Sequence, residues 1–356
     1  MGNKCTPSIK FDQRSGNKLV VIPLIDNKKV KKQFMRWESL QRKLGSNAIA
    51  RLSELDNKKF KRYLADGPPD NIRKEVWKVA LEVRKIIGLD KSAHEDHAFI
   101  EKDLDRTFPY HSFFLRKKGK EALRDVLLTF VNNHPELGYC QGMNSVAGVF
   151  LIVSENTTES YAMLKNLCYR FGAKLLYEFE FPLVSVLCKE FHLVLAEKMP
   201  DLDMYLKDIE LDDNLWLTKW FMTLFSYSFH IQCVVRFWDA VFAYGLEYMV
   251  NIALGVLEYL KPFFIGKNLQ DMLEFFPALR EIVVDIDLVL YYSSRFAVRQ
   301  MPGELQCRSY SLSQEADDSD PIKTNWEVTP NTTQNSKNVL EEFSECFSNN
   351  SSKFYV

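Results

Sequence analysis

Apolar residues recur at three- and four-residue steps over most of the sequence between residues 70 and 261. The first such run follows Asp70 and consists of Ile72, Val76, Trp77, Val79, Ala80, Val83 and Ile86. This spacing places the apolar side chains on one face of an α-helix. Asp70 has a side chain that can cap this helix, and Gly88 stands where a helix commonly ends. The pattern therefore predicts a helix between Asp70 and Gly88.

The same helical period continues beyond this first run, and no strand-like alternation interrupts it. The further segments are residues 120–132, 139–153, 158–171, 182–199, 213–229, 231–243 and 246–261. We therefore predict an all-α domain of about 230 residues, whose helices pack through Leu, Phe and Trp faces.

Composition divides the chain into three zones. Residues 1–36 carry nine Lys/Arg against two Asp/Glu and show no sustained apolar period, which predicts a flexible basic arm. Ser, Asn, Thr and acidic residues dominate residues 304–356, which predicts a disordered acidic tail. The folded domain is expected to occupy residues 37–303.

Bulk properties exclude several classes of protein. The formal net charge is -1, so the overall charge gives no reason to expect nucleic acid as a partner. Seven scattered cysteines without a C-x-x-C pair, and no secretory signal peptide, indicate a reduced cytoplasmic setting. The stretch Leu137–Ser154 has 18 residues without a charge. Its first half holds Gly, Gln and Asn, which are costly in hydrocarbon, so we predict no transmembrane segment.

The motif HEDH at His94–His97 is the only spacing that suggests a metal site. It places two histidines three residues apart with carboxylates between them, but no second pair of ligands lies nearby in the sequence. We interpret it as a solvated loop or helix end and predict no metal. The sequence also lacks a phosphate-binding G-x-x-x-x-G-K-[ST] loop and a G-x-S-x-G nucleophile elbow. Nothing therefore indicates a self-contained active site.

Two polar motifs need another explanation. In IEKDLDRTFP (Ile100–Pro109), Asp103 and Arg106 are one helical step apart, so the carboxylate can orient the guanidinium. Taken alone, however, this spacing favours a surface ion pair of little energetic value. In GYCQGMN, Gln141 stands at the start of an apolar run. A buried carboxamide needs hydrogen-bond partners or costs roughly 1–3 kcal/mol, whereas an exposed one can take its partner from another molecule.

These motifs occur in a fixed order with two others, GPPDNIRKEVW (Gly67–Trp77) and RFWDAVFAYG (Arg236–Gly245). In that order they resemble the TBC domain of Rab GTPase-activating proteins, over roughly residues 40–300. The departures are Pro68, where the family usually has an aliphatic residue, and SFHIQ (Ser228–Gln232), where the family commonly has proline. The resemblance implies an all-helical fold that accelerates GTP hydrolysis by a Rab protein in vesicle trafficking.

The resemblance also implies two catalytic residues that are supplied in trans, an arginine finger at Arg106 and a glutamine finger at Gln141. A guanidinium stabilises the negative charge that shifts during phosphoryl transfer, and such fingers raise rates by about 10³–10⁵. A carboxamide has both a donor and an acceptor, so it can orient the attacking water.

Other motif residues are expected to support these two. Asp103 would orient Arg106, and Asn144 would form hydrogen bonds beneath Gln141. Tyr139 and Gly142 belong to the same supporting group, and Gly142, with Gly138, would keep side chains away from the partner. A further set is assigned to architecture, as a buried network between the first helix and a later one: Arg73, Trp77, Arg236, Trp238 and Asp239.

No cofactor is expected in the chain itself, because GTP and Mg²⁺ would belong to the partner GTPase. The chain would then be a GTPase activator rather than an enzyme with its own substrate. Two alternatives remain: a Rab-binding scaffold without catalytic activity, and a helical module that binds other proteins.

The N-terminal sequence MGNKCTPS suggests attachment to a membrane. Gly2 heads the N-myristoylation pattern M-G-x-x-x-[ST], with Thr6 in place, and Cys5 is a candidate for palmitoylation. One acyl chain binds a membrane only marginally, so a second signal is needed. The arm offers four lysines, Lys28, Lys29, Lys31 and Lys32. We expect a cytoplasmic protein bound peripherally to the cytosolic face of a membrane.

Overall fold

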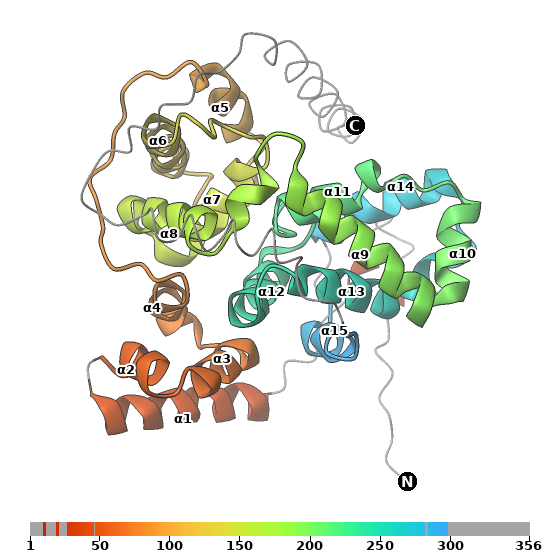
Figure 1. Ribbon diagram of the computed structural model, residues 1–356, viewed down its shortest axis with the longest axis horizontal. Coiled ribbons are helices and arrows are strands. Elements are labelled where there is room, and N and C mark those ends of the chain that lie inside the picture. The colour runs from red at the N-terminus through yellow and green to blue at the C-terminus, as the bar shows by residue number, and fades with distance from the viewer. Residues whose placement is uncertain (1–9, 12–18, 21–26, 46, 282–283, 298–356) are drawn as a thin grey trace.

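Helices make up most of the computed structural model, which describes residues 10–11, 19–20, 27–45, 47–281 and 284–297 (Figure 1). The first eight α-helices are α1 (Asn27–Leu44), α2 (Ala48–Leu55), α3 (Asn57–Asp66), α4 (Asp70–Ala80), α5 (His97–Leu104), α6 (Lys117–Asn133), α7 (Met143–Ser154) and α8 (Thr157–Tyr169). They are followed by α9 (Pro182–Lys198), α10 (Pro200–Asp208), α11 (Leu217–Met222), α12 (Ile231–Tyr244), α13 (Tyr248–Phe264), α14 (Leu269–Ala278) and α15 (Ile286–Ser293).

Short elements complete the described part of the chain. Three 3₁₀ helices are η1 (Ala173–Leu176), η2 (Asp213–Leu215) and η3 (Leu279–Glu281). Two strands of two residues each, β1 (Lys10–Phe11) and β2 (Leu19–Val20), pair antiparallel. The predicted all-α class is confirmed. The expected tail over residues 304–356 lies outside the described residues.

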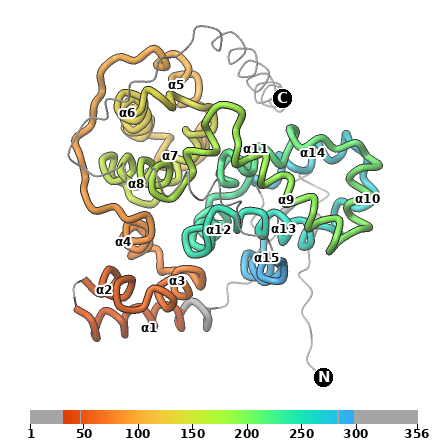
Figure 2. The backbone as a smooth tube through the Cα atoms, viewed as in Figure 1, coloured from red at the N-terminus to blue at the C-terminus, as the bar shows by residue number. Residues whose placement is uncertain are grey.

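The helices form three groups (Figure 1). Helices α1, α2 and α3 form a layer at one end, helices α5 to α8 form a group at the other end, and helices α9 to α15 lie beside both. Figure 2 shows the chain leaving α4 and running along the edge of the molecule to α5. The first and second groups are therefore joined by α4 and this long connection.

An aromatic cluster lies where α4, α7 and α12 meet. Trp77 is fully buried, and its ring centroid lies 6.2 Å from that of Phe150 and 5.5 Å from that of Trp238. Phe242 closes the cluster at 5.3 Å from Trp77. Edge-to-face aromatic pairs each add about 0.5–1.5 kcal/mol beyond the burial of their surface. The cluster therefore fixes three helices that are distant in the sequence.

The predicted flexible arm over residues 1–36 is wrong at its C-terminal end, because α1 begins at Asn27. Trp37 and Leu40 are buried, so this helix has a core-facing side. Gln33 donates to the backbone oxygen of Asp66, and Arg36 pairs with its carboxylate. These contacts hold the middle of α1 against the end of α3. The basic composition of residues 1–36 gave no indication of this helix, because its stability comes from tertiary contacts.

The predicted helix between Asp70 and Gly88 is too long, because α4 ends at Ala80. The chain then turns, with Glu82 at a left-handed φ of 55°. Asp70 does not cap the helix but stands inside its first turn and pairs with Arg73. The predicted helix over residues 213–229 is also interrupted, since α11 ends at Met222 and left-handed residues follow it.

No helix within the described ranges combines the length and the apolar character that crossing a bilayer requires. The same ranges hold no group of three or more His, Cys, Asp or Glu side chains arranged to bind a metal ion.

Candidate functional site

Arg106 lies in the turn that follows α5, and its guanidinium is held from one side. Its Nη2 pairs with Oδ1 of Asp103, which is buried near the end of the helix. The Arg106 side chain itself remains 31% exposed, whereas that of Asp103 is 3% exposed. The buried carboxylate therefore fixes the base of a cationic group that another molecule can still reach.

Tyr139 engages the second oxygen of the same carboxylate, since its hydroxyl donates to Oδ2 of Asp103. Burial raises the pKa of Asp103, and the nearby charge of Arg106 opposes that shift. Burial, and next the charge of Asp103, raise the pKa of the Tyr139 hydroxyl well above its ordinary value. The phenol is therefore protonated at neutral pH and acts as a donor. Asp103 receives Arg106 and Tyr139 together.

Gln141 lies against the same guanidinium. With its carboxamide oxygen facing Arg106, the orientation in which the amide meets donors, it accepts a hydrogen bond from Nη1 at 3.3 Å and another from Nη2. The two residues are 35 positions apart in the sequence, and the fold brings their side chains into contact. Arg106, Gln141, Asp103 and Tyr139 form one connected polar group, which we call the finger cluster.

Asn144 connects the segments that carry Arg106 and Gln141. It is buried in the first turn of α7, and its Oδ1 accepts from the backbone nitrogen of Gly142 at 3.0 Å. Its Nδ2 donates to Oγ1 of Thr107 at 2.8 Å, and that hydroxyl donates to the backbone oxygen of Asp103 at 2.6 Å. One buried amide therefore couples the turn that carries Arg106 to the loop that carries Gln141.

The backbone conformation at position 142 favours glycine. Its φ of 110° lies in the region that side chains rarely adopt, and it forms the N-cap position of α7. A Cβ there would stand 3.1 Å from Cγ2 of Thr223, in the segment after α11. The glycine thus lets that segment pack directly against the loop of Gln141.

Asp96 is a residue of this site that the sequence analysis missed. Its Oδ2 accepts the backbone N–H of Tyr139 at 2.9 Å, two residues before Gln141. Gly138 has a φ of 63°, and a Cβ on it would come within 3.3 Å of the same oxygen. In the sequence Asp96 belongs to the HEDH motif, which we interpreted as a solvated loop or helix end, and it is the N-cap residue of α5. In the fold, the Asp96 carboxylate holds the loop that carries Gln141, which we call the glutamine loop. Asp96 and Tyr139 are 43 residues apart in the sequence.

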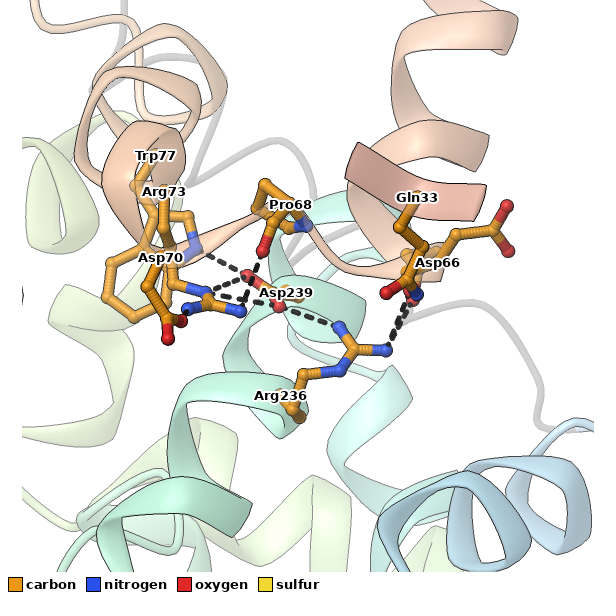
Figure 3. Close-up of polar contacts among 9 residues, drawn as sticks. Gln33, Asp66, Pro68, Asp70, Arg73, Trp77, Arg236 and Asp239 are labelled. Atoms are coloured by element: carbon orange, nitrogen blue, oxygen red, sulfur yellow. Dashed lines mark hydrogen bonds and ion pairs between the residues drawn. The ribbon is translucent and has the colours of Figure 1, made fainter. Parts of the chain in front are cut away.

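Three of the residues assigned to architecture converge on a fourth, the buried carboxylate of Asp239 in α12 (Figure 3). Arg73 reaches it through Nε at 3.3 Å and 3.4 Å from its two oxygens, and Trp77 donates through Nε1 at 2.8 Å. Arg236 donates from Nη1 at 2.6 Å. Two guanidinium groups and an indole therefore share one buried anion between α4 and α12.

Arg236 extends this network to the α1–α3 layer (Figure 3). Its Nη2 donates to the backbone oxygens of Ala65 at 3.2 Å and Asp66 at 3.1 Å. Any Cβ on Gly67 would clash with its guanidinium, which explains the glycine. Trp238 points elsewhere and donates to the backbone oxygen of Leu224 at 2.8 Å. It thus anchors the segment that follows α11.

The lipidation candidates Gly2 and Cys5 lie outside the described residues.

Comparison with sequences of known proteins gives matches over most of the chain. A family model described as the Rab-GTPase-TBC domain matches residues 70–265. TBC1 domain family member 1 from Homo sapiens is 26% identical over 314 residues, which are 81% of this chain and 26% of that protein. GTPase-activating protein GYP5 from Saccharomyces cerevisiae is 25% identical over 237 residues, 64% of this chain and 26% of that protein. The chain thus spans about a quarter of the length of these relatives.

Solved structures share the fold. The TBC domain of the Chlamydomonas flagellar RabGAP aligns with a TM-score of 0.62 at 21% identity, covering 75% of this chain and 91% of that one. The Ypt/Rab-GAP domain of Gyp1p aligns with a TM-score of 0.62 at 16% identity, covering 75% of this chain and 98% of that one.

Proposed function

Because the chain belongs to the Rab-GTPase-TBC domain family, we propose that it stimulates GTP hydrolysis by a Rab-family small GTPase with Arg106 and Gln141 supplied in trans. The observation that carries this proposal is the contact between the Gln141 carboxamide and the Arg106 guanidinium, with Asp103 behind the latter. GTP and Mg²⁺ belong to the partner, so the chain acts as an activator and has no substrate of its own.

Arg106 would act on the charge that develops between the β- and γ-phosphates. Asp103 holds one side of the guanidinium, which leaves further N–H donors for phosphate oxygens. Since Asp103 is itself held by Tyr139, the guanidinium keeps its direction before the partner arrives. Such preorganised donors need little rearrangement at the moment of reaction, which is the main source of electrostatic catalysis.

Gln141 would position the attacking water. Its oxygen accepts from Arg106 in the free protein, and the partner's phosphates would compete for the same N–H donors. Binding would then release the carboxamide oxygen to accept from the water, while the amide N–H₂ contacts the partner. The two fingers are therefore expected to engage as a unit.

A single-turnover GTPase assay with a panel of GTP-loaded Rab proteins tests this proposal. We expect acceleration of at least one Rab, and a loss of about 10³-fold or more for Arg106→Ala. Arg106→Lys should rescue little, because an ammonium lacks the planar fork of donors. Unchanged melting of the variants would show that the fold is intact. Binding to a Rab without acceleration would instead favour the inactive scaffold, and neither binding nor acceleration would favour a helical interaction module.

We further propose peripheral attachment to the cytosolic face of a membrane through acylation of Gly2 and Cys5. The support is the N-terminal pattern, and anchoring would confine the activator to the surface that carries its partner. Gly2→Ala should move the protein from the membrane fraction to the soluble fraction, and Cys5→Ser should do so less completely. An unacylated N-terminus in mass spectrometry of protein from its native cell would exclude this anchor.

A further inference from the structure

The α1–α3 layer, residues 27–66, carries a charge quite unlike that of the rest of the chain. It holds twelve of the 46 Lys and Arg residues but only four of the 47 Asp and Glu residues. The layer precedes residues 70–265, which match the family model. Its positive charge is therefore a property of this end of the molecule rather than of the matched domain.

The cations of α3 surround a hollow on the surface of this layer. The hollow has a volume of about 430 Å³ and is lined by Lys58, Lys59, Lys61, Arg62, Asp56 and Tyr244. Among the described residues, no carboxylate forms an ion pair with any of these four cations. The single acidic side chain, Asp56, accepts the backbone N–H of Lys59 at the start of α3. Four cations thus line the hollow without a carboxylate partner, and two of them, Lys59 and Arg62, also stand over the Tyr63 ring at 5.7 Å and 5.8 Å from its centroid.

Apolar side chains are exposed on the same layer. Phe34 is 48% exposed and Met35 is 54% exposed, and both stand one helical turn from the exposed Lys31 on α1. Leu55, at the end of α2, is 72% exposed. Lysines beside exposed apolar side chains are the composition of helices that lie in the interface of an anionic bilayer. Met35 and Leu55 have no aromatic face on which a nucleic-acid base could stack.

The position of the layer leaves the finger cluster accessible. The layer and α5, which ends just before Arg106, lie at opposite ends of the molecule in Figure 1. A surface that covers α1 to α3 would therefore not cover Arg106.

We propose that the α1–α3 layer is a docking surface for a bilayer that contains anionic phospholipids. The four cations of α3 would lie among the lipid phosphates, and Phe34, Met35 and Leu55 would enter the headgroup region. This inference rests on charge complementarity and exposure, and it depends neither on acylation of Gly2 nor on the proposed GTPase activation.

Vesicle flotation with the full-length chain tests it. All proteins carry Gly2→Ala and Cys5→Ser, so that acylation contributes nothing. The vesicles are either phosphatidylcholine alone or phosphatidylcholine with roughly 30% phosphatidylserine, which gives an anionic surface. We expect binding only to the anionic vesicles, with an affinity that falls as salt is raised. Each cation near such a leaflet contributes about fivefold to affinity. The quadruple variant Lys58→Gln, Lys59→Gln, Lys61→Gln and Arg62→Gln should therefore bind several hundredfold more weakly.

A matched variant tests whether vesicle binding depends on the cations of α3 or only on the total positive charge of the protein. It neutralises four exposed cations on other elements, Arg84, Lys85, Lys189 and Lys198, and should bind within about threefold of the parent. Phe34→Ser with Met35→Ser should weaken vesicle binding at least about tenfold without changing the salt dependence. Equal losses in the two quadruple variants, or retained binding in the α3 variant, would overturn the proposal. Tighter binding to single-stranded RNA than to the anionic vesicles at physiological salt would also overturn it.

Discussion

Asp96 shows how a single carboxylate can hold a loop that is distant from it in the sequence, here the loop that carries Gln141. It accepts the N–H of Tyr139, and Tyr139 in turn donates to Asp103 beneath Arg106. The side chain therefore acts on Gln141 and Arg106 through Tyr139 alone, as a positioning residue. Its neighbour Glu95 is exposed and provides a matched control.

We expect Asp96→Ala to lower the maximal rate of stimulated GTP hydrolysis about tenfold, because a lost hydrogen bond to a charged acceptor is worth about 1.5–3 kcal/mol. The concentration of activator that gives half of the maximal rate should change little. Asp96→Asn keeps an acceptor oxygen and should restore most of the rate, whereas Glu95→Ala should have no effect. A loss in Asp96→Ala that Asp96→Asn does not restore would assign the residue to charge rather than to positioning.

The contact between Arg106 and Gln141 predicts strong non-additivity. In the proposed mechanism both residues serve one transition state, so removing either should disable most of what the other contributes. The double variant Arg106→Ala, Gln141→Ala should therefore be within about threefold of the slower single variant in single-turnover assays. Losses that multiply would show that the two fingers act independently.

Sequence reasoning reached the members of this site by different routes. The resemblance pointed to Arg106, Gln141, Asp103 and Asn144 because each stands in a short motif. The spacing of Asp103 and Arg106 alone favoured a surface ion pair, whereas in the structure the Asp103 carboxylate is buried. The role of Asp96 could not be predicted, because a hydrogen bond between residues 43 positions apart leaves no local sequence pattern.

The bounds of the helices, too, could be predicted only where the local sequence determines them. Long segments with a sustained apolar period, such as α6 and α13, were predicted near their observed bounds. The early end of α4 was not, because apolar residues continue the helical spacing beyond it while Glu82 turns the backbone left-handed. The start of α1 was also missed, since its contacts with Asp66 are tertiary. Periodicity records which face is buried, but not where tertiary contacts begin or end a helix.

His134, the C-cap residue of α6, is a buried histidine just before the loop that carries Gln141. Its backbone oxygen accepts the N–H groups of Leu137 and Gly138, both at 3.1 Å. Its ring lies between those of Phe130 and Tyr169, at centroid distances of 5.0 Å and 4.4 Å. Burial lowers its pKa to about 4. The neutral ring is thus the form that fits the fold.

The sign of the pH effect follows from this lowered pKa. The unfolded chain gains a proton on His134 as pH falls through about 6.5, but the folded chain does so only near pH 4. The free energy of unfolding should therefore fall by up to about 3 kcal/mol between pH 6.5 and pH 4 through this residue. His134→Phe should remove that component, and the exposed His97 supplies the control His97→Gln. Denaturant titrations at pH 7 and pH 4.5 measure the difference, and parallel pH dependences of wild type and His134→Phe would contradict the assignment.

One buried anion joins α4 and α12 to the end of the α1–α3 layer. Asp239 is fully buried and receives Arg73, Trp77 and Arg236, which places α4, α12 and the end of α3 in a single network. Removing one partner from a buried charge network leaves the remaining charges uncompensated, at a cost of about 3–5 kcal/mol. The sequence motifs contain all four residues, but the convergence of both guanidinium groups on one carboxylate becomes visible only in the fold.

We therefore expect Asp239→Asn to lower the free energy of unfolding by at least about 3 kcal/mol, and the melting temperature by roughly 6–12 °C. The amide still accepts from Trp77, so the loss reports on the charge rather than on the indole hydrogen bond. Asp70→Asn is the matched control. It removes a carboxylate that pairs with the same Arg73, but the Asp70 side chain is 94% exposed, so the cost should stay below about 1 kcal/mol.

Hydrogen exchange should show faster opening of α3 in Asp239→Asn, because Arg236 would lose the anion that orients it toward the carbonyl groups of Ala65 and Asp66. Equal destabilisation by the two variants would show that Asp239 is no more than one of several replaceable ion-pair partners.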